Sequence, residues 1–371
     1  MISRTEVKPY WEFIRFCIDA QQPVPESIEK MDWEKLFLFM KQQALTGVGF
    51  QGIERLKENH VDVPRTLLLK WYALSEKIKA RNMYMDKCCV ELAGLLAKDG
   101  FKSCVLKGQG NTLFYPDPYV RSSGDIDIFV MSDERMGIKE RRKTVLRYVR
   151  KRFPQTRVRY QHIDFPVFKD VEVEMHFIPT AKNNPVYNYR IQQWVEKQMP
   201  RQCANVVCLP DGIGTIPVPT DEFNLVYQMS HMMHHFLDEG IGLGQMMDYY
   251  YLLRKANDEL IMDNGPLRMT LRYLNLYQFA GAVMYVMREV FGLEEKMMIV
   301  PVDERRGKTL MDEILKGGNF GKHSGLTRHS TGVKYFLKIR RNMRFVREYP
   351  AEALCEPWFR TWHFFWRLWN K

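Results

Sequence analysis

The sequence predicts an α+β protein in which a small mixed β-sheet core is flanked by N-terminal and C-terminal helical regions. Apolar residues recur at helical spacing through residues 1–100, short alternating strands follow over 101–218, and helical spacing returns over 219–371. We therefore divide the chain at these boundaries into an N-terminal helical region, a core and a C-terminal helical domain.

Composition excludes several classes of protein. The 371 residues are 46% hydrophobic and 27% charged, ordinary values for a globular protein with a sizeable core. No apolar run approaches the length of a membrane span, and the first residues lack the apolar segment of a signal peptide. The seven cysteines are odd in number and form no Cys-x-x-Cys pair, which favours reduced thiols over disulfides or a zinc site. We expect a cytoplasmic protein without a transmembrane span.

Helical spacing is clearest in three stretches of the N-terminal region, at residues 26–40, 65–80 and 83–98. Asp99-Gly100 ends the third stretch with a C-cap glycine. No pattern in this region suggests chemistry, so its expected role is to cap the core.

The central feature of the core is the segment Ser123-Gly124-Asp125-Ile126-Asp127-Ile128-Phe129-Val130. Residues two apart on a strand project to the same face, so Asp125 and Asp127 lie together while the isoleucines turn into the core. Like charges this close are costly unless a cation lies between them, and Mg²⁺ prefers carboxylate oxygens. The segment therefore predicts a metal-binding strand.

A third carboxylate is available on a later strand, at 171–177, where polar and apolar residues alternate. Glu172, Glu174 and His176 share the polar face of this strand. Together with 162–168 it is expected to form a β-hairpin around Lys169-Asp170. By this pattern alone either glutamate completes the acidic set, and His176 either orients a carboxylate or phosphate or simply ends the polar face.

A glycine turn precedes the acidic strand. Cys104-Val105-Leu106 is expected to be a short buried strand, and Lys107-Gly108-Gln109-Gly110 leads from it to a short helix that begins at Asn111. Free backbone N–H groups, a glycine that permits close approach and the charge of Lys107 suit a phosphate. Arg121 has two interpretations, a bidentate phosphate ligand or the ion-pair partner of a local aspartate.

The order of these segments resembles the uncharacterised nucleotidyltransferases of the polymerase-β-like superfamily. The matching segments, which cover about residues 102–180, are Leu106-Lys107-Gly108, Leu113-Phe114-Tyr115-Pro116-Asp117-Pro118, Arg121, Gly124-Asp125-Ile126-Asp127 and Val173-Glu174-Met175-His176. The resemblance implies that Asp125, Asp127 and Glu174 hold two Mg²⁺ ions, and its Val-Glu-x-His context favours Glu174 over Glu172.

The resemblance also implies that the turn at Lys107 and Gly108 grips the nucleotide phosphates, with Gly124 and Arg121 contributing to the same binding. One feature departs from the superfamily. Its usual turn is Gly-Ser with a shorter spacer, whereas here Lys107-Gly108 is followed by residues 109–124 before Asp125. The Lys-Gly form is nevertheless the one that this group of uncharacterised proteins carries.

The activity implied by the resemblance is a Mg²⁺-dependent transfer of a nucleoside monophosphate from an NTP, with ATP the expected donor, to a hydroxyl of a small molecule or protein. Transfer to an RNA end and a non-catalytic nucleotide-binding scaffold remain open as alternatives. Residues 135–159 carry eleven Lys/Arg and one acid, Glu140, which suits RNA but equally a solvated helix face. The sequence does not identify the acceptor.

The C-terminal region contains a helix, expected to begin after Thr220, that carries His231 and His235. The pair lies four residues apart but lacks the glutamate of a His-Glu-x-x-His zinc motif, so a zinc site is disfavoured. The resemblance implies that His231 or His235, and the later Asp248, are recurring positions of the helical domain, for which we expect packing or orientation near the cleft. The glycines of 317–321 favour a helix end over a second phosphate loop.

Aromatic and basic residues alternate along the last segment. The aromatic residues at helical spacing are Trp358, Trp362, Phe365, Trp366 and Trp369, with Arg360, Arg367 and Lys371 between them. A basic aromatic helix can lie on a membrane surface. We favour packing on its own domain or on a second copy in a homodimer, because such stripes usually serve cores.

Overall fold

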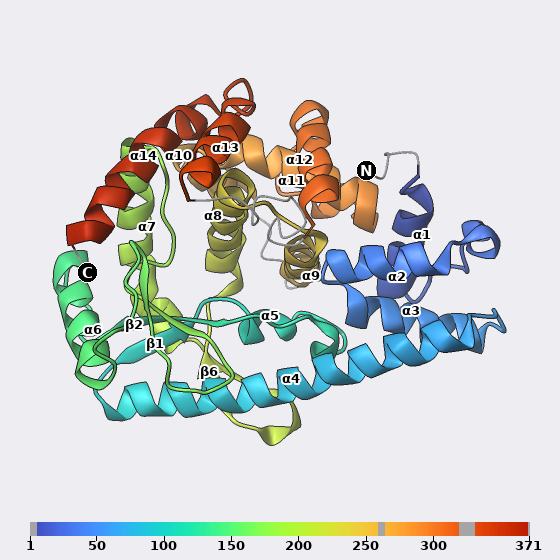
Figure 1. Cartoon of the computed structure of the whole chain (residues 1–371), viewed down its shortest axis with the longest axis horizontal. Coiled ribbons are helices and arrows are strands. Elements are labelled where there is room, and N and C mark those ends of the chain that lie inside the picture. The colour runs from blue at the N-terminus through green and yellow to red at the C-terminus, as the bar shows by residue number, and fades with distance from the viewer. Residues whose placement is uncertain (1–5, 259–263, 319–330, 370–371) are drawn as a thin grey trace. The chain divides into compact units, whose positions relative to one another are not determined.

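The computed structural model of the chain (Figure 1) describes residues 6–258, 264–318 and 331–369. It contains a four-stranded mixed sheet and a two-stranded antiparallel sheet among many helices, which confirms the predicted α+β class with its flanking helices. No helix within these ranges is long and apolar enough to cross a membrane. All seven cysteines are free, and Cys17, Cys88, Cys89 and Cys104 are buried.

The chain packs as two compact units, each built from segments far apart in the sequence. Unit 1 comprises Met1–Asn82, Phe114–Ser122 and His235–Lys334, and unit 2 comprises Met83–Leu113, Ser123–His234 and Tyr335–Lys371. The divisions at residues 100 and 218 follow the sequence pattern and stay a prediction.

Unit 1 is helical. Its elements are α1 (Lys8–Ile18), η1 (Glu26–Lys30), α2 (Trp33–Gln42), α3 (Thr46–Glu58), the first part of α4 (Arg65–Lys98), η2 (Pro118–Val120), α9 (Leu243–Asp258), α10 (Asn264–Tyr273), α11 (Tyr277–Phe291), η4 (Glu295–Met297) and α12 (Glu304–Gly317). The apolar α11 is the central element, with α1, α9 and α12 packed against it. Gly307 allows α12 to approach closely, since a Cβ there would overlap Tyr285.

Several helices begin or end at residues other than those that the sequence predicts. The stretch 26–40 is divided at Asp32, whose carboxylate accepts from the backbone N–H of Lys35 and caps α2. The stretches 65–80 and 83–98 form one continuous helix, α4. Asn275, with φ of 55°, separates α10 from α11. Helix α12 ends at Gly317 with Gly318 at φ of 59°, as expected of a helix end, and residues 319–321 of that glycine cluster lie outside the described residues.

Unit 2 contains both sheets. The strands β1 (Lys102–Val105), β2 (Ile126–Met131), β4 (Val173–His176) and β3 (His162–Asp164) lie in that spatial order. Strand β2 pairs antiparallel with β1 and parallel with β4, and β4 pairs antiparallel with β3. The β3–β4 pairing confirms the predicted hairpin. A second hairpin, which the turn sequence Pro210-Asp211-Gly212 predicts, is formed by β5 (Val206–Cys208) and β6 (Thr215–Pro217), joined through η3 (Pro210–Gly212).

The helices of unit 2 include the later part of α4, α5 (Gln109–Thr112), α6 (Ile138–Arg152), α7 (Pro185–Ala204), most of α8 (Asp221–Asp238), the later part of α13 (Thr331–Met343) and α14 (Pro350–Trp369). Ile126 and Ile128 of β2 enter a buried apolar cluster with side chains of α4 and α6, as predicted. Because side chains alternate along a strand, this packing leaves Asp127 on the opposite face.

Two helix starts in unit 2 differ from those that the sequence predicts. The segment Ser132-Asp133-Glu134 predicts a helix N-cap. Helix α6 instead begins after Gly137, and Asp133 Oδ1 accepts from the N–H of Arg135 in a tight turn. Helix α7 was not expected, although Asn184 at its N-cap and Pro185 at its first position are typical start signals.

The aromatic helix α14 packs partly on its own unit, beside the start of α7 in Figure 1. The ring of Tyr160 lies 5.3 Å from that of Trp362 and 6.3 Å from that of Trp366. The guanidinium of Arg142 lies 4.0 Å over the Trp366 ring. Trp358, by contrast, is 80% exposed. Packing on its own domain thus accounts for one face of α14, and the side chains beyond residue 366 lie outside the described part.

Candidate functional site

Asp127 and Glu174 lie side by side on neighbouring strands. They are register partners in the parallel pair β2–β4, so their side chains share one face of the sheet. Asp125, one residue before β2, brings a carboxylate to the same place, and one oxygen from each of the three lies within 4.8 Å of the others. Glu172 is exposed and is not part of this group. The structure thus brings together the three carboxylates that the resemblance selects.

The three carboxylates differ in pKa because their neighbours differ. The negative charge of Asp127, together with burial, raises the pKa of Asp125 to about 6. Burial alone would raise the pKa of Asp127, but the Lys107 ammonium and His176 hold it well below its usual range. The pKa of Glu174 is also lowered: a hydrogen bond from His176 and the nearby His162 outweigh its burial. Asp125 therefore bears most of the repulsion in the group.

His176 is a buried cation that holds two of these carboxylates. Its Nε2 donates to Asp127 Oδ1 over 2.9 Å and lies 3.5 Å from Glu174 Oε2, while its Nδ1 donates to the backbone oxygen of Ile178 over 3.2 Å. Burial opposes protonation, yet the bonds to Asp127 and Glu174 raise the pKa of His176 to about 9. This geometry agrees with the interpretation in which His176 orients a carboxylate.

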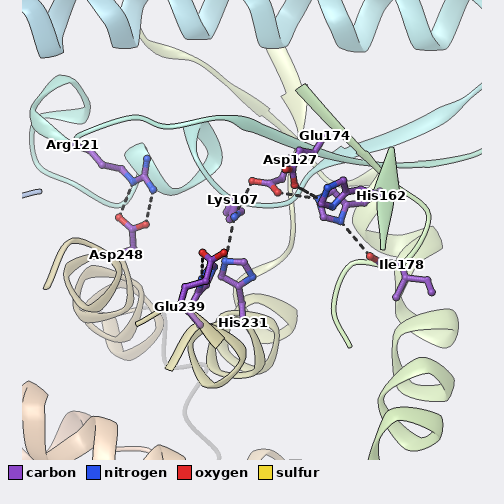
Figure 2. Close-up of polar contacts among 11 residues, drawn as sticks. Lys107, Arg121, Asp127, His162, Glu174, Ile178, His231, Glu239 and Asp248 are labelled. Carbon is purple, nitrogen blue, oxygen red and sulfur yellow. Dashed lines mark hydrogen bonds and ion pairs between the residues drawn. The ribbon is translucent and has the colours of Figure 1, made fainter. Parts of the chain in front are cut away.

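Lys107 points toward the acidic group (Figure 2). Its Nζ forms an ion pair with Asp127 Oδ2 at 2.9 Å and lies 3.2 Å from His231 Nε2. Because an ammonium group can only donate, Nε2 of His231 is the acceptor of this contact. His231 thereby joins the site through Lys107. Of the two possible three-ligand metal groups that the described residues offer, neither includes His231 or His235.

The turn after β1 requires glycine at one position. Gly108 has φ of 66° and ψ of −113°, a combination that residues with a Cβ rarely adopt. The following Gln109 links the turn to its surroundings: its Nε2 donates to the buried Asp86 over 2.6 Å, and its Oε1 accepts from Ser123 over 3.2 Å. These bonds join the turn to the segment that leads into Asp125. A Cβ at Gly124 would meet no atom, so open space adjoins that position.

Arg121 belongs to unit 1 and is held there by Asp248. Its Nε and Nη2 donate to the two oxygens of Asp248, each over 2.8 Å, in the forked arrangement seen in Figure 2. Tyr115 also donates to Asp248, over 2.7 Å, and Asn82 donates to the backbone oxygen of Arg121 over 2.7 Å. The ion-pair interpretation of Arg121 is therefore correct in kind, but its partner is distant in sequence rather than local. Its phosphate role stays a prediction.

Sequence reasoning missed three residues that lie at or beside the carboxylates. Asp86 and Gln109 support the glycine turn, and His162 on β3 places Nδ1 3.1 Å from Glu174 Oε2. A signal for His162 was present in the sequence. It begins a strand already expected to pair with the one that carries Glu174, and it lies two residues from Asp164, so both share a polar face.

Fold and site together define an α+β protein with an acidic group on the open face of a mixed sheet. The chain belongs to the uncharacterised nucleotidyltransferase family, whose model matches residues 29–292. No curated protein and no solved structure matches it. The family match reaches well beyond residues 102–180 into helices of both units. The protein is accordingly a transferase of nucleotidyl groups, for which a nucleotide substrate and a divalent metal are implied in general.

Proposed function

We propose that the protein moves a nucleoside monophosphate from an NTP, with ATP as the expected donor, to a hydroxyl of a small molecule or a protein in a Mg²⁺-dependent reaction. The observation that carries this proposal is the group formed by Asp125, Asp127 and Glu174, whose oxygens lie within 4.8 Å of one another in a chain of this family.

The chemistry of this group suits Mg²⁺, because all three side chains offer carboxylate oxygens and none offers nitrogen or sulfur. The pKa of Asp125 is raised because its carboxylate is repelled by that of Asp127, and a divalent cation bound between them would relieve this repulsion. Two Mg²⁺ ions bound here would activate the acceptor hydroxyl and stabilise the leaving pyrophosphate. The protein's own share is positioning and charge neutralisation rather than a covalent nucleophile.

The neighbouring residues have distinct roles in this proposal. His176 fixes the carboxylates of Asp127 and Glu174 in place. Lys107 exchanges its ion pair with Asp127 for a phosphate oxygen, which restores Asp127 as a metal ligand. The backbone at Gly108 and the open space beside Gly124 allow the phosphates to approach closely. Arg121 is proposed as a further phosphate contact, a role that competes with its bond to Asp248.

The decisive experiment is a calorimetric titration of the four NTPs with Mg²⁺ into the wild type and into Asp125→Asn/Asp127→Asn. We expect metal-dependent binding of at least one NTP to the wild type and none to the double variant. The proposal fails if the wild type binds no NTP with any divalent metal tested.

Transfer to an RNA end is a second candidate, favoured by one face of α6. The side chains of Lys139, Lys143, Arg147 and Lys151 recur every four residues and are exposed. Other basic residues of the segment serve structure instead: Arg141 is buried against Glu196, and Arg152 pairs with Asp99. The remaining stripe is a basic surface suited to phosphates. A non-catalytic scaffold is less well supported, since it gains nothing from three repelling acids.

Location and assembly belong to the same proposal. The seven free thiols support a cytoplasmic protein. The exposed face of α14, with Leu354, Trp358 and Phe365, supports a homodimer contact. Light scattering of the wild type and of Trp358→Glu tests the dimer: a mass of two chains that falls to one in the variant is expected, and a single-chain mass for the wild type overturns it.

A further inference from the structure

We propose that His162, Glu174 and His176 form a separate binding position for one transition-metal ion such as Zn²⁺, beside the acidic group. The two groups share Glu174 but differ in ligand chemistry, because this one offers two imidazole nitrogens and one carboxylate oxygen. Imidazole ligands favour zinc and related metals, whereas Mg²⁺ prefers oxygen alone. The inference stands on the geometry of β3 and β4 and does not require nucleotidyl transfer.

The distances between the ligand atoms fit a tetrahedral ion. Glu174 Oε2 lies 3.1 Å from His162 Nδ1 and 3.5 Å from His176 Nε2. Zinc bonds to nitrogen and oxygen are about 2.0–2.1 Å long, so neighbouring ligands of a tetrahedral site lie about 3.3 Å apart. The two measured separations lie on either side of that value. One ligand atom from each of the three residues lies within 4.8 Å of the other two, so they are close enough to share one ion.

The backbone holds these side chains in register. His162 and His176 are paired across the antiparallel strands β3 and β4, and Asp164 is paired with Glu174 in the same ladder. All four side chains consequently project from the same face of the sheet. Ligands on paired strands are positioned more rigidly than ligands on loops, which favours a preformed site.

Each histidine also has an acceptor near its other nitrogen. Nδ1 of His176 bonds to the backbone oxygen of Ile178 over 3.2 Å, and its Nε2 faces both Asp127 Oδ1, at 2.9 Å, and Glu174 Oε2, at 3.5 Å. An ion bound at Nε2 would displace the proton that this nitrogen donates to Asp127. Nε2 of His162 lies 3.9 Å from Asp164 Oδ1, and its Nδ1 faces Glu174. Metal-binding histidines almost always direct the second nitrogen to a carbonyl or carboxylate, which fixes the ring. His176 has this arrangement, whereas the Asp164 carboxylate lies near His162 Nε2 but beyond hydrogen-bond distance.

Burial and access also suit a bound ion. His162 and His176 are 8% and 5% exposed, whereas the Glu174 side chain is 22% exposed. The ion would thus be shielded on the histidine side and open toward Glu174, where a water or substrate oxygen can supply a fourth ligand. Because Glu174 is shared, an ion at this position withdraws one oxygen from the acidic group and competes with Mg²⁺ for it.

The test uses the full chain, stripped of metal with a chelator and titrated with Co²⁺ as a coloured probe for Zn²⁺. We expect one Co²⁺ per chain, visible absorption typical of a tetrahedral site, and displacement by Zn²⁺. His162→Ala removes a direct ligand and should weaken binding by more than the about 10–100-fold that loss of an outer-shell partner costs. Asp125→Asn, which alters only the acidic group, should retain both the affinity and the colour, and His60→Ala, at an exposed histidine of unit 1, serves as a control.

A second variant guards against a folding defect in His162→Ala. His162→Cys keeps a ligand at the position and should bind Co²⁺ with an added thiolate absorption band. The inference is overturned if the wild type binds no Co²⁺ stoichiometrically, or if folded His162→Ala binds as tightly as the wild type. It is equally overturned if Asp125→Asn loses the ion as completely as His162→Ala does. Nucleotide titrations play no part in these outcomes, so the nucleotidyl-transfer proposal and this one fail separately.

Discussion

Asp127 and Glu174 are register partners on the parallel strands β2 and β4, so the sheet itself sets the spacing of two of the three carboxylates. Strand β2 lies between β1 and β4 and buries the isoleucines on either side of Asp127. A carboxylate fixed to an inner strand has little freedom to avoid its neighbours. Its repulsion is instead balanced by Lys107 and His176.

Replacement of Glu174 by Gln should lower Mg²⁺-dependent NTP affinity or turnover about 100-fold or more, because the variant removes a charge aimed at the metal position. Glu172→Gln is the matched control, two residues away on an exposed side chain. It should retain nearly full activity. Calorimetry and a pyrophosphate-release assay measure the two variants, and equal losses in both would contradict the choice of Glu174.

Asp125→Asn should stabilise the metal-free protein. The charge of Asp127 and burial raise the pKa of Asp125 to about 6, so the carboxylate is ionised at pH 7.5 at a cost in stability. Removal of that charge should increase the free energy of unfolding by about 1–3 kcal/mol. Urea denaturation in a chelator measures this change. Saturating Mg²⁺ should reverse the order, because only the wild type gains stability from bound metal.

The sequence predicts those features of the site that depend on residues close together in the chain. The alternation around Asp125 and Asp127 correctly indicates which residues share a face, because the period of a strand is a local property. The buried β2 and the β3–β4 hairpin follow from the same local patterns. The choice between Glu172 and Glu174 required the family resemblance, since both lie on one face of the predicted strand.

Contacts between distant segments were not predictable in this way. Arg121 pairs with Asp248 within unit 1, and Lys107 contacts His231 within unit 2. Each pair joins residues more than 120 positions apart, so it depends on how distant segments pack together within the unit. The continuous α4 was missed because two amphipathic stretches resemble two helices when no tertiary contacts are known. The periodicity of apolar residues indicates which face of a helix or strand is buried, but it does not indicate which other element packs against that face.

Arg121→Ala should destabilise the protein by about 3–5 kcal/mol, because it leaves the carboxylate of Asp248 buried without its forked partner. Arg121→Ala/Asp248→Ala should recover part of this loss, since no isolated charge remains. Thermal or urea unfolding of the wild type, the two single variants and the double variant gives the coupling free energy between Arg121 and Asp248. An unchanged stability in Arg121→Ala would show that the pair has no structural role and would favour the phosphate-ligand interpretation.

The exposed basic stripe of α6 should determine any RNA binding. A variant with Gln at Lys139, Lys143, Arg147 and Lys151 should bind RNA with a weaker dependence on salt. The slope of log affinity against log salt concentration should fall by up to about 3, at about 0.7 per lost phosphate contact. A control with equal charge change uses four exposed lysines of α4: Lys77, Lys79, Lys87 and Lys98. Gel shifts at several salt concentrations distinguish them. Equal effects of the two sets would indicate non-specific charge attraction, and no shift with the wild type would rule out this alternative.

Lys182 makes the stability of the protein depend on pH. The side chain is 4% exposed, and its Nζ lies 3.4 Å from Met233 Sδ. Burial lowers the pKa of Lys182 from its ordinary value of 10.5 to about 8, although the charge of Glu352 opposes this effect. Below pH 8 the folded protein must keep a buried ammonium group, and this cost is relieved as the pH rises from about 8 toward 10.5.

Lys182→Met removes that cost and should therefore stabilise the protein by about 1–3 kcal/mol at pH 7. The advantage of the variant over the wild type should shrink between pH 8 and pH 10.5, because the wild-type amine becomes neutral in that window. Urea denaturation of both proteins across this range measures the difference, and Lys182→Arg, which keeps its charge, should show no such relief. A difference that stays constant from pH 8 to pH 10.5 would mean that folding does not lower the pKa of Lys182, and would contradict this prediction.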